Sequence, residues 1–102
     1  MLKDEYPALW LFLGGYLHQD WDLDYDSPEA ALRDFIAGEH VLAPQLPAEV
    51  DRVLARGESD AALNELLLEF GSSYLPTGVG ASPRTWLTSV RQDVRAAVDA
   101  RR

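Results

Sequence analysis

The chain has 102 residues, which suits one domain with a modest core, and its content of 47% hydrophobic and 25% charged residues is ordinary for a globular protein. It contains no cysteine, which excludes disulfides, thiolate metal sites and a cysteine nucleophile. The net charge of −8 is uneven, because residues 1–70 hold 15 acidic and four basic residues whereas residues 71–102 hold two and five. This acidic surplus argues against direct binding of nucleic acid, whose phosphates need a basic surface, and favours a cationic protein partner.

The start of the chain does not look like an export signal. Two acidic residues accompany the single lysine of residues 1–5, and Pro7 and two glycines interrupt the short apolar run that follows. No stretch approaches the roughly 18 apolar residues of a membrane span. The sequence therefore predicts a cytoplasmic protein without a membrane partner.

Apolar residues at helical spacing predict an all-α fold, with residues 1–102 forming a single small domain, a compact bundle of about five helices. The five ranges are 6–17, 28–38, 48–56, 60–70 and 83 to near the C-terminus. Ser27 and Ser59 are predicted N-caps, and Ser82 restarts the chain as the last helix. Gly14 and Gly15 weaken the first helix and indicate either close packing by another element or a break.

The stretch HQDWDLDYD, residues 18–26, places four aspartates at alternate positions. A calcium loop of the EF-hand type is not supported, because no register combines the required aspartate, glycine and glutamate positions. A catalytic pair of His18 with Asp20 or Asp22 also lacks support, since the chain has no nucleophile elbow, phosphate-binding glycine loop or second histidine at ligand spacing. We therefore expect no metal, no cofactor and no catalytic residue, and a protein that is not an enzyme.

Two of the four aspartates have no structural explanation in the sequence. Asp26 precedes the second predicted helix, where negative charge is stabilising by about 0.3–1 kcal/mol. Asp22 and Asp24 would project on one side of an extended segment about 7 Å apart, which is unfavourable without a nearby cation. That cation could come from a partner, or from an arginine face on the last helix, and both possibilities stay open. The arginine face comprises Arg84, Arg91, Arg95 and Arg102.

The fourth predicted helix adds further acidic residues. Glu65 and Glu69 are four residues apart, a mildly destabilising like-charge pair, and Glu58 is expected on the same face. A solvated helix face is the simplest explanation of this helix alone, but two acidic ridges together favour a surface that binds a partner. The predicted partner-binding residues are Asp22, Asp24, Glu58, Glu65 and Glu69.

Most of the chain resembles a known family. The stretch GGYLHQDWDLDYDSPEAALRDF, residues 14–35, resembles the immunity proteins of bacterial contact-dependent growth inhibition systems, the CdiI-like family. Weaker similarity continues in VDRVLARGESDAALNELLLEFGSSYLP and in SPRTWL. Within HQDW, residues His18, Asp20 and Trp21 are the hallmark of the resemblance, and we expect them to be architectural, fixing the exit of the first helix.

The resemblance implies a small intracellular inhibitor that binds and neutralises the C-terminal toxin domain of an exoprotein delivered by a neighbouring cell. Such toxins are commonly nucleases, whose cationic active sites an acidic ridge could occlude. The resemblance carries over no catalytic residues and no contact residues, because each member is matched to its own toxin. The alternative is a small acidic adaptor or regulatory module with a non-toxin partner; a metal-dependent enzyme is a distant third hypothesis.

Overall fold

The computed structural model describes residues 1–101, which contain helices and no strand. The α-helices are α1 (Leu2–Glu5), α2 (Pro7–Trp10), α3 (Trp21–Asp24), α4 (Pro28–Gly38), α5 (Leu46–Ala55), α6 (Asp60–Glu69) and α7 (Pro83–Ala100). A π-helix, η1 (Leu11–Tyr16), continues α2, and two short 3-10 helices are η2 (Ala43–Gln45) and η3 (Pro76–Val79). The all-α prediction is confirmed. Within the described residues, no helix is both long and apolar enough to cross a membrane.

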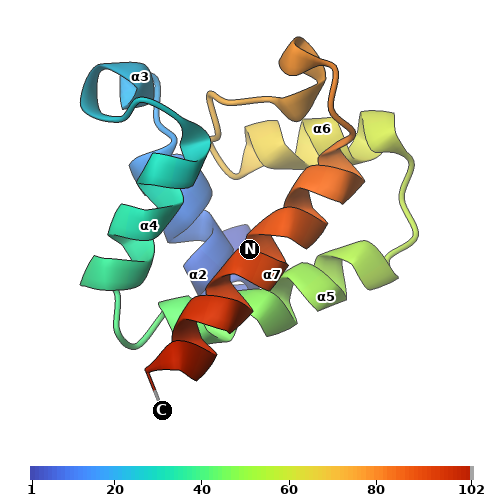
Figure 1. The fold of residues 1–102 in the computed structure, drawn as a ribbon. Helices are drawn as coiled ribbons and strands as arrows, with labels where there is room; N and C mark the ends of the chain where they lie inside the picture. The colour runs from blue at the N-terminus through green and yellow to red at the C-terminus, as the bar shows by residue number, and fades with distance from the viewer. Residues whose placement is uncertain (102) are drawn as a thin grey trace.

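The long C-terminal helix α7 organises the fold. It crosses the molecule diagonally in front of α2, with α5 below it, α6 above its N-terminal end and α4 on its other side (Figure 1). Helical spacing directs Phe12, Phe35 and Trp86 inward, and the Phe12 ring centroid lies 5.5 Å from that of Phe35 and 6.3 Å from that of Trp86. These aromatic contacts lie within one buried apolar cluster that joins the helices.

Close packing explains Gly14 of the first predicted helix. A Cβ atom added to Gly14 would lie 2.6 Å from the backbone oxygen of Phe70, so no larger residue fits without movement. The neighbouring Gly71 has a φ of 94°, a conformation that favours glycine. Beyond it, the Ser73 N–H donates to the Leu17 carbonyl at 2.8 Å. The first predicted helix is thus continuous but changes to π geometry where it meets the end of α6.

Local signals predicted the helix starts well. The side chains of Ser27 and Ser59 accept hydrogen bonds from backbone N–H groups at 3.1 and 3.2 Å, as N-caps do, and Ser82 does the same for α7 at 3.3 Å. Helix α5 begins at Leu46, two residues before its predicted start, because Pro47 fits the first turn of a helix.

The extended backbone considered for residues 20–26 is wrong. Residues 21–24 form α3, and the Tyr25 N–H donates to the Trp21 carbonyl at 2.9 Å. A single helical turn rotates successive side chains by about 100°, so Asp22 and Asp24 do not project on one side as strand residues would. The aspartates therefore occupy a short, tightly turned protrusion at the top of Figure 1.

Candidate partner-binding surface

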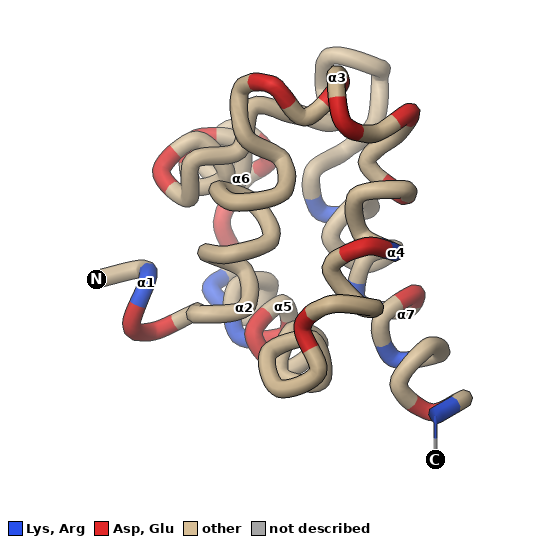
Figure 2. Tube along the Cα trace, turned by 90° about the vertical axis from the view of Figure 1, so that its left-hand side faces the viewer, with Lys and Arg blue, Asp and Glu red and all other residues tan. Residues whose placement is uncertain are grey.

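The α3 ridge, which we define as Asp22, Leu23 and Asp24, is an exposed acidic feature in the first third of the chain. All three residues are exposed, and the Leu23 side chain is 82% exposed although it is apolar. An exposed leucine between two carboxylates has no structural role in the core. Figure 2 shows acidic positions on α3 and, separately, on α6.

His18 organises the approach to this ridge. Its Nδ1 accepts a hydrogen bond from the Asp20 N–H at 3.1 Å, and its Nε2 lies 3.5 Å from a carboxylate oxygen of Asp24. Because Nδ1 accepts, the ring proton of neutral His18 is on Nε2 and points toward Asp24. One histidine thus contacts both ends of the turn.

Aromatic residues tie α3 to the rest of the molecule. The rings of Trp21 and Tyr74 meet edge to face with centroids 5.7 Å apart, and Tyr74 in turn lies 5.3 Å from Trp86. The Tyr25 hydroxyl donates to the Asp34 carboxylate of α4, which raises the pKa of Tyr25 to about 12. These contacts are of a structural kind, and the architectural role expected of the HQDW residues stays a prediction; the side chain of Asp20 is exposed.

Two residues of the arginine face of α7, Arg84 and Arg91, pair with residues outside the α3 ridge. The Arg84 guanidinium donates to the Glu58 carbonyl at 2.7 Å. Arg91 lies 2.6 Å from the Asp51 carboxylate of α5, the closest ion pair of the described residues. Arg95 is exposed and Arg102 lies outside the described residues. In the part of the chain that the structure describes, His18 is the basic residue paired with the ridge.

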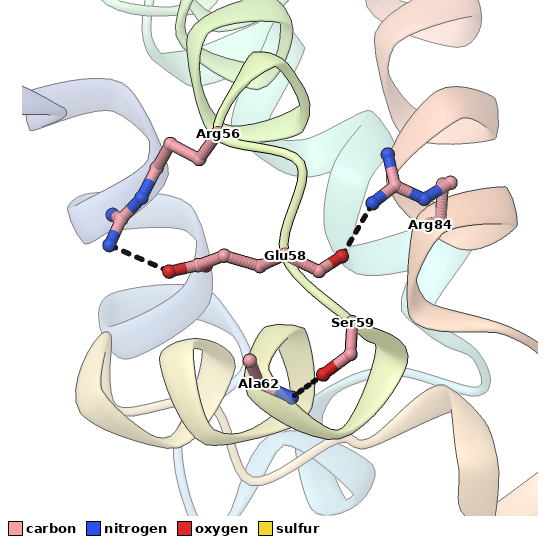
Figure 3. A network of polar contacts seen from close by, with 5 residues as sticks. All are labelled: Arg56, Glu58, Ser59, Ala62 and Arg84. Carbon is pink, nitrogen blue, oxygen red and sulfur yellow. Dashed lines mark hydrogen bonds and ion pairs between the residues drawn. The ribbon is translucent and has the colours of Figure 1, made fainter.

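The acidic residues of the fourth predicted helix divide into two kinds. Glu65 and Glu69 are exposed on α6, with Leu68, 55% exposed, beside them; we call these three residues the α6 ridge. Glu58 is instead half-buried just before α6, and its carboxylate accepts from Arg56 at 2.9 Å while its carbonyl accepts from Arg84 (Figure 3). The structure therefore separates Glu58 in environment from the two glutamates with which the sequence grouped it.

A hollow lies beside the α3 ridge, and the sequence did not indicate it. It has a volume of about 510 Å³ and lies between the start of α4 and the segment 73–79. Its apolar lining includes Trp21, Tyr74, Leu75 and Val79, and two acidic residues, Asp26 and Glu29, also line it. We call it the Trp21–Tyr74 hollow. It forms only when the loop after α6 folds back onto α3, which no local pattern predicts.

Comparison with known proteins decides the family. A family model described as CdiI immunity protein matches residues 5–94. The chain belongs to the CdiI immunity protein family. It is also 27% identical to a chain of the crystal structure of the CdiA-CT/CdiI complex from Y. kristensenii 33638, with a TM-score of 0.81 and coverage of 88% of this chain and 98% of that chain. No curated protein matches significantly.

Membership in the CdiI family confirms the resemblance and the prediction of an immunity protein rather than an enzyme. The matched range contains both acidic ridges and the whole hollow. In the described part of the chain, no group of three or more His, Cys, Asp or Glu residues could hold a metal ion. The family match also disfavours the alternative of an unrelated acidic adaptor.

One carboxylate of this CdiI family member has a role that sequence reasoning missed. Glu49 of α5 is only 2% exposed, and its two oxygens accept from the N–H groups of Ala8 at 3.1 Å and Leu9 at 2.9 Å. It caps α2, whose first residue, Pro7, has no N–H. Burial raises the pKa of Glu49, although the two hydrogen bonds and Arg52 oppose that shift. Glu49 therefore belongs to the interior and not to the acidic surface.

Exposed leucines are the second feature that sequence reasoning missed. Leu23 and Leu68 each lie among acidic residues, outside the spacing that defines the core stripe of a helix. For Leu68, this departure from the core spacing of α6 was a signal in the sequence that the side chain is exposed. An apolar centre surrounded by charge is typical of the interior of a protein interface and its polar rim.

Proposed function

We propose that this protein binds the cognate C-terminal toxin domain of a contact-dependent growth inhibition exoprotein and neutralises it by covering a cationic surface. The observation that carries the proposal is the α3 ridge, whose Asp22 and Asp24 are exposed and paired with neither Arg84 nor Arg91. The similarity to a chain of a CdiA-CT/CdiI complex supports a toxin domain as the partner. Binding by occlusion requires no catalytic group on the immunity protein.

We further propose that the toxin is a nuclease. A nuclease must hold a polyanion, so its active site carries positive charge that an acidic protein can cover. This chain has a net charge of −8, with its acidic surplus in residues 1–70, which contain both ridges. Complementary charge accelerates association and orients the two proteins as they meet. The protein acts in the cytoplasm, where a delivered nuclease would meet its substrate.

Co-expression provides the direct test. The toxin domain encoded beside this gene is expressed in cells with or without the immunity protein, and growth and integrity of cellular RNA and DNA are followed. We expect growth and intact nucleic acid only with the immunity protein, and co-purification of the two proteins in equal amounts. Continued killing without co-purification would contradict the immunity function. Protection from a toxin that leaves nucleic acids intact would contradict only the nuclease proposal.

A matched pair of variants tests the role of charge. Asp22→Asn with Asp24→Asn removes the charges of the α3 ridge, and Glu65→Gln with Glu69→Gln removes those of the α6 ridge. Both pairs change exposed side chains, so the folded protein should be preserved in each. The pair that weakens protection identifies the ridge that faces the toxin, and we expect it to be the α3 pair.

A further inference from the structure

The Trp21–Tyr74 hollow combines two kinds of wall. One wall is aromatic and aliphatic, formed by Trp21, Tyr74 and Val79, and Val79 is 70% exposed. The other contains the acidic residues Asp26 and Glu29, both of which are exposed. The volume of about 510 Å³ is within the range of roughly 300–1,000 Å³ that is usual for ligand-sized clefts. A hollow of this composition suits a group that is flat and apolar on its faces and positive at its edge.

We infer that the Trp21–Tyr74 hollow receives an arginine side chain that projects from a loop of the toxin domain, and that this contact is the energetic centre of the complex. The inference rests on the proposed function, whose partner it specifies in chemical terms. The guanidinium plane packs against the aromatic wall, and its N–H groups donate to Asp26 and Glu29.

The chemistry of the walls selects arginine over other occupants. A purely apolar occupant would exclude water from Asp26 and Glu29 without giving them a partner, and an unpaired carboxylate in a water-excluded site is costly. Arginine stacks on aromatic rings and donates in a planar fork that matches a carboxylate. Lysine carries the charge but lacks the plane, so it would use only one of the two walls.

The hollow is a better interface centre than either acidic ridge alone. Residues that dominate binding energy occupy well-packed pockets from which surrounding contacts exclude water. Leu23 of the α3 ridge, next in sequence to Asp22, and Val79 at the hollow itself supply exposed apolar surface that a partner could cover. The residues of neither ridge line the hollows described for this chain, but Trp21, which precedes the α3 ridge directly in sequence, lines the Trp21–Tyr74 hollow.

A second copy of this chain is a poor occupant. Two molecules that met through this surface would bring together the carboxylates of Asp22, Asp24, Asp26 and Glu29 from both partners. Like charges at an interface favour separation, and the net charge of −8 adds to that repulsion. The charge around the hollow therefore favours a cationic partner.

The test uses two exposed valines. Val79→Arg places a guanidinium of this chain at the hollow, where it competes for the carboxylates, whereas Val41→Arg adds the same charge at a residue that is 76% exposed and does not line the hollow. Affinity for the purified toxin domain is measured for both variants and for the unaltered protein by calorimetry. We expect Val79→Arg to weaken binding by about 30-fold or more, the size of a hot-spot loss, and Val41→Arg by less than about threefold.

A double-mutant cycle identifies the partner residue. Glu29→Gln in this chain is combined with single Arg→Ala and Lys→Ala changes in the toxin domain, and we expect coupling to one arginine of roughly tenfold or more. Coupling to a lysine instead, or to no basic residue, would overturn the inference.

Each remaining outcome is separable from the proposed function. If the unaltered protein does not bind the toxin domain, the proposed function itself fails. If it binds, and Val79→Arg binds as tightly as Val41→Arg, the proposed function stands and the inference is wrong. A homodimer in sedimentation experiments that Val79→Arg dissociates would also overturn it.

Discussion

Carboxylates near two helix starts show how differently the same chemistry is used in this molecule. At the junction of α2 and α5, Glu49 is buried and accepts two backbone hydrogen bonds. On α3, Asp22 and Asp24 are exposed, and the basic residue paired with Asp24 is His18 at 3.5 Å. The junction satisfies its charge within the fold, whereas the ridge leaves its charge to solvent or to a partner.

This difference between buried and exposed carboxylates predicts which positions tolerate substitution. Removing a buried acceptor leaves its hydrogen-bond donors without a partner. This lowers the free energy of unfolding far more than removing a solvated charge does. The junction is therefore constrained by folding, whereas folding places little constraint on the exposed α3 ridge. A protein that must match one particular toxin gains from keeping these two constraints on separate residues.

Replacing Glu49 should give the largest change in stability. Glu49→Ala leaves the Ala8 and Leu9 N–H groups without their acceptors, and we expect a loss of about 3 kcal/mol in the free energy of unfolding measured in urea. The matched control, Glu69→Ala, removes an exposed glutamate and should change this energy by less than about 0.5 kcal/mol. Equal losses in both variants would contradict the contrast between interior and surface.

The same residue predicts a direction of pH dependence. Because burial raises the pKa of Glu49 above its ordinary value of 4.5, the folded state binds its proton more tightly than the unfolded state does. The contribution of Glu49 to stability is therefore largest below pH 4.5 and decreases as the pH rises through the folded pKa. Glu49→Gln should remove this component from the difference in urea stability measured across that pH range.

Gly14→Ala should have the next largest effect. The new methyl group would meet the Phe70 backbone oxygen, and we expect a loss of roughly 1–3 kcal/mol, as for other overpacked sites. Gly15→Ala is the matched control, because its nearest neighbour is the end of the flexible Leu11 side chain at 3.0 Å. Its thermal unfolding temperature should stay the same or rise, since alanine favours helix over glycine by about 1 kcal/mol.

Trp21→Ala tests whether one residue beside the α3 ridge serves both stability and toxin binding. The Trp21 side chain is half-buried, so we expect a loss of about 1–2 kcal/mol in stability, below the roughly 3–5 kcal/mol of a fully buried tryptophan. The ring also lines the hollow, so toxin affinity should fall further than the loss of stability explains. Urea unfolding and calorimetric binding of the same preparation separate the two effects. A loss confined to stability would assign Trp21 to the interior alone.

The smallest change in stability should come from the ridge. Asp22→Asn with Asp24→Asn should leave the unfolding temperature nearly unchanged and slow toxin association by about 3- to 10-fold at low salt, with a weaker salt dependence. Stopped-flow measurements over a range of ionic strength check this. An association rate equal to that of the unaltered protein would show that these charges are only solvated surface.

Local patterns predicted the parts of the fold that local energies determine. The capping serines Ser27 and Ser59 and the apolar stripes of the long helices need only neighbours in sequence, and the structure has them where expected. The prediction for residues 21–24 failed because alternating aspartates resemble a strand. In the structure, side-chain contacts of His18 and Trp21 hold this segment as a helical turn.

The site was less predictable than the fold. Acidic composition indicated the exposed aspartates of α3. The sequence around Glu49, by contrast, is typical of a surface residue in the first turn of a helix, and only the contacts of Glu49 with α2 show that it is buried. The Trp21–Tyr74 hollow is formed by two segments about half the chain apart in sequence, and no rule of residue spacing predicts that they meet. Pairing of Asp24 with His18 likewise depends on a three-dimensional turn.

The contact between Trp21 and Tyr74 has a consequence for the order of events during synthesis. Tyr74, whose ring supports α3 through Trp21, is synthesised about half a chain later than α3 itself. The same is true of Ser73, whose N–H donates to the Leu17 carbonyl at 2.8 Å. Such contacts of high sequence separation form late in folding. A nascent chain that has not yet emerged past residue 74 thus lacks the Trp21–Tyr74 contact, so α3 gains this support only after most of the chain has been made.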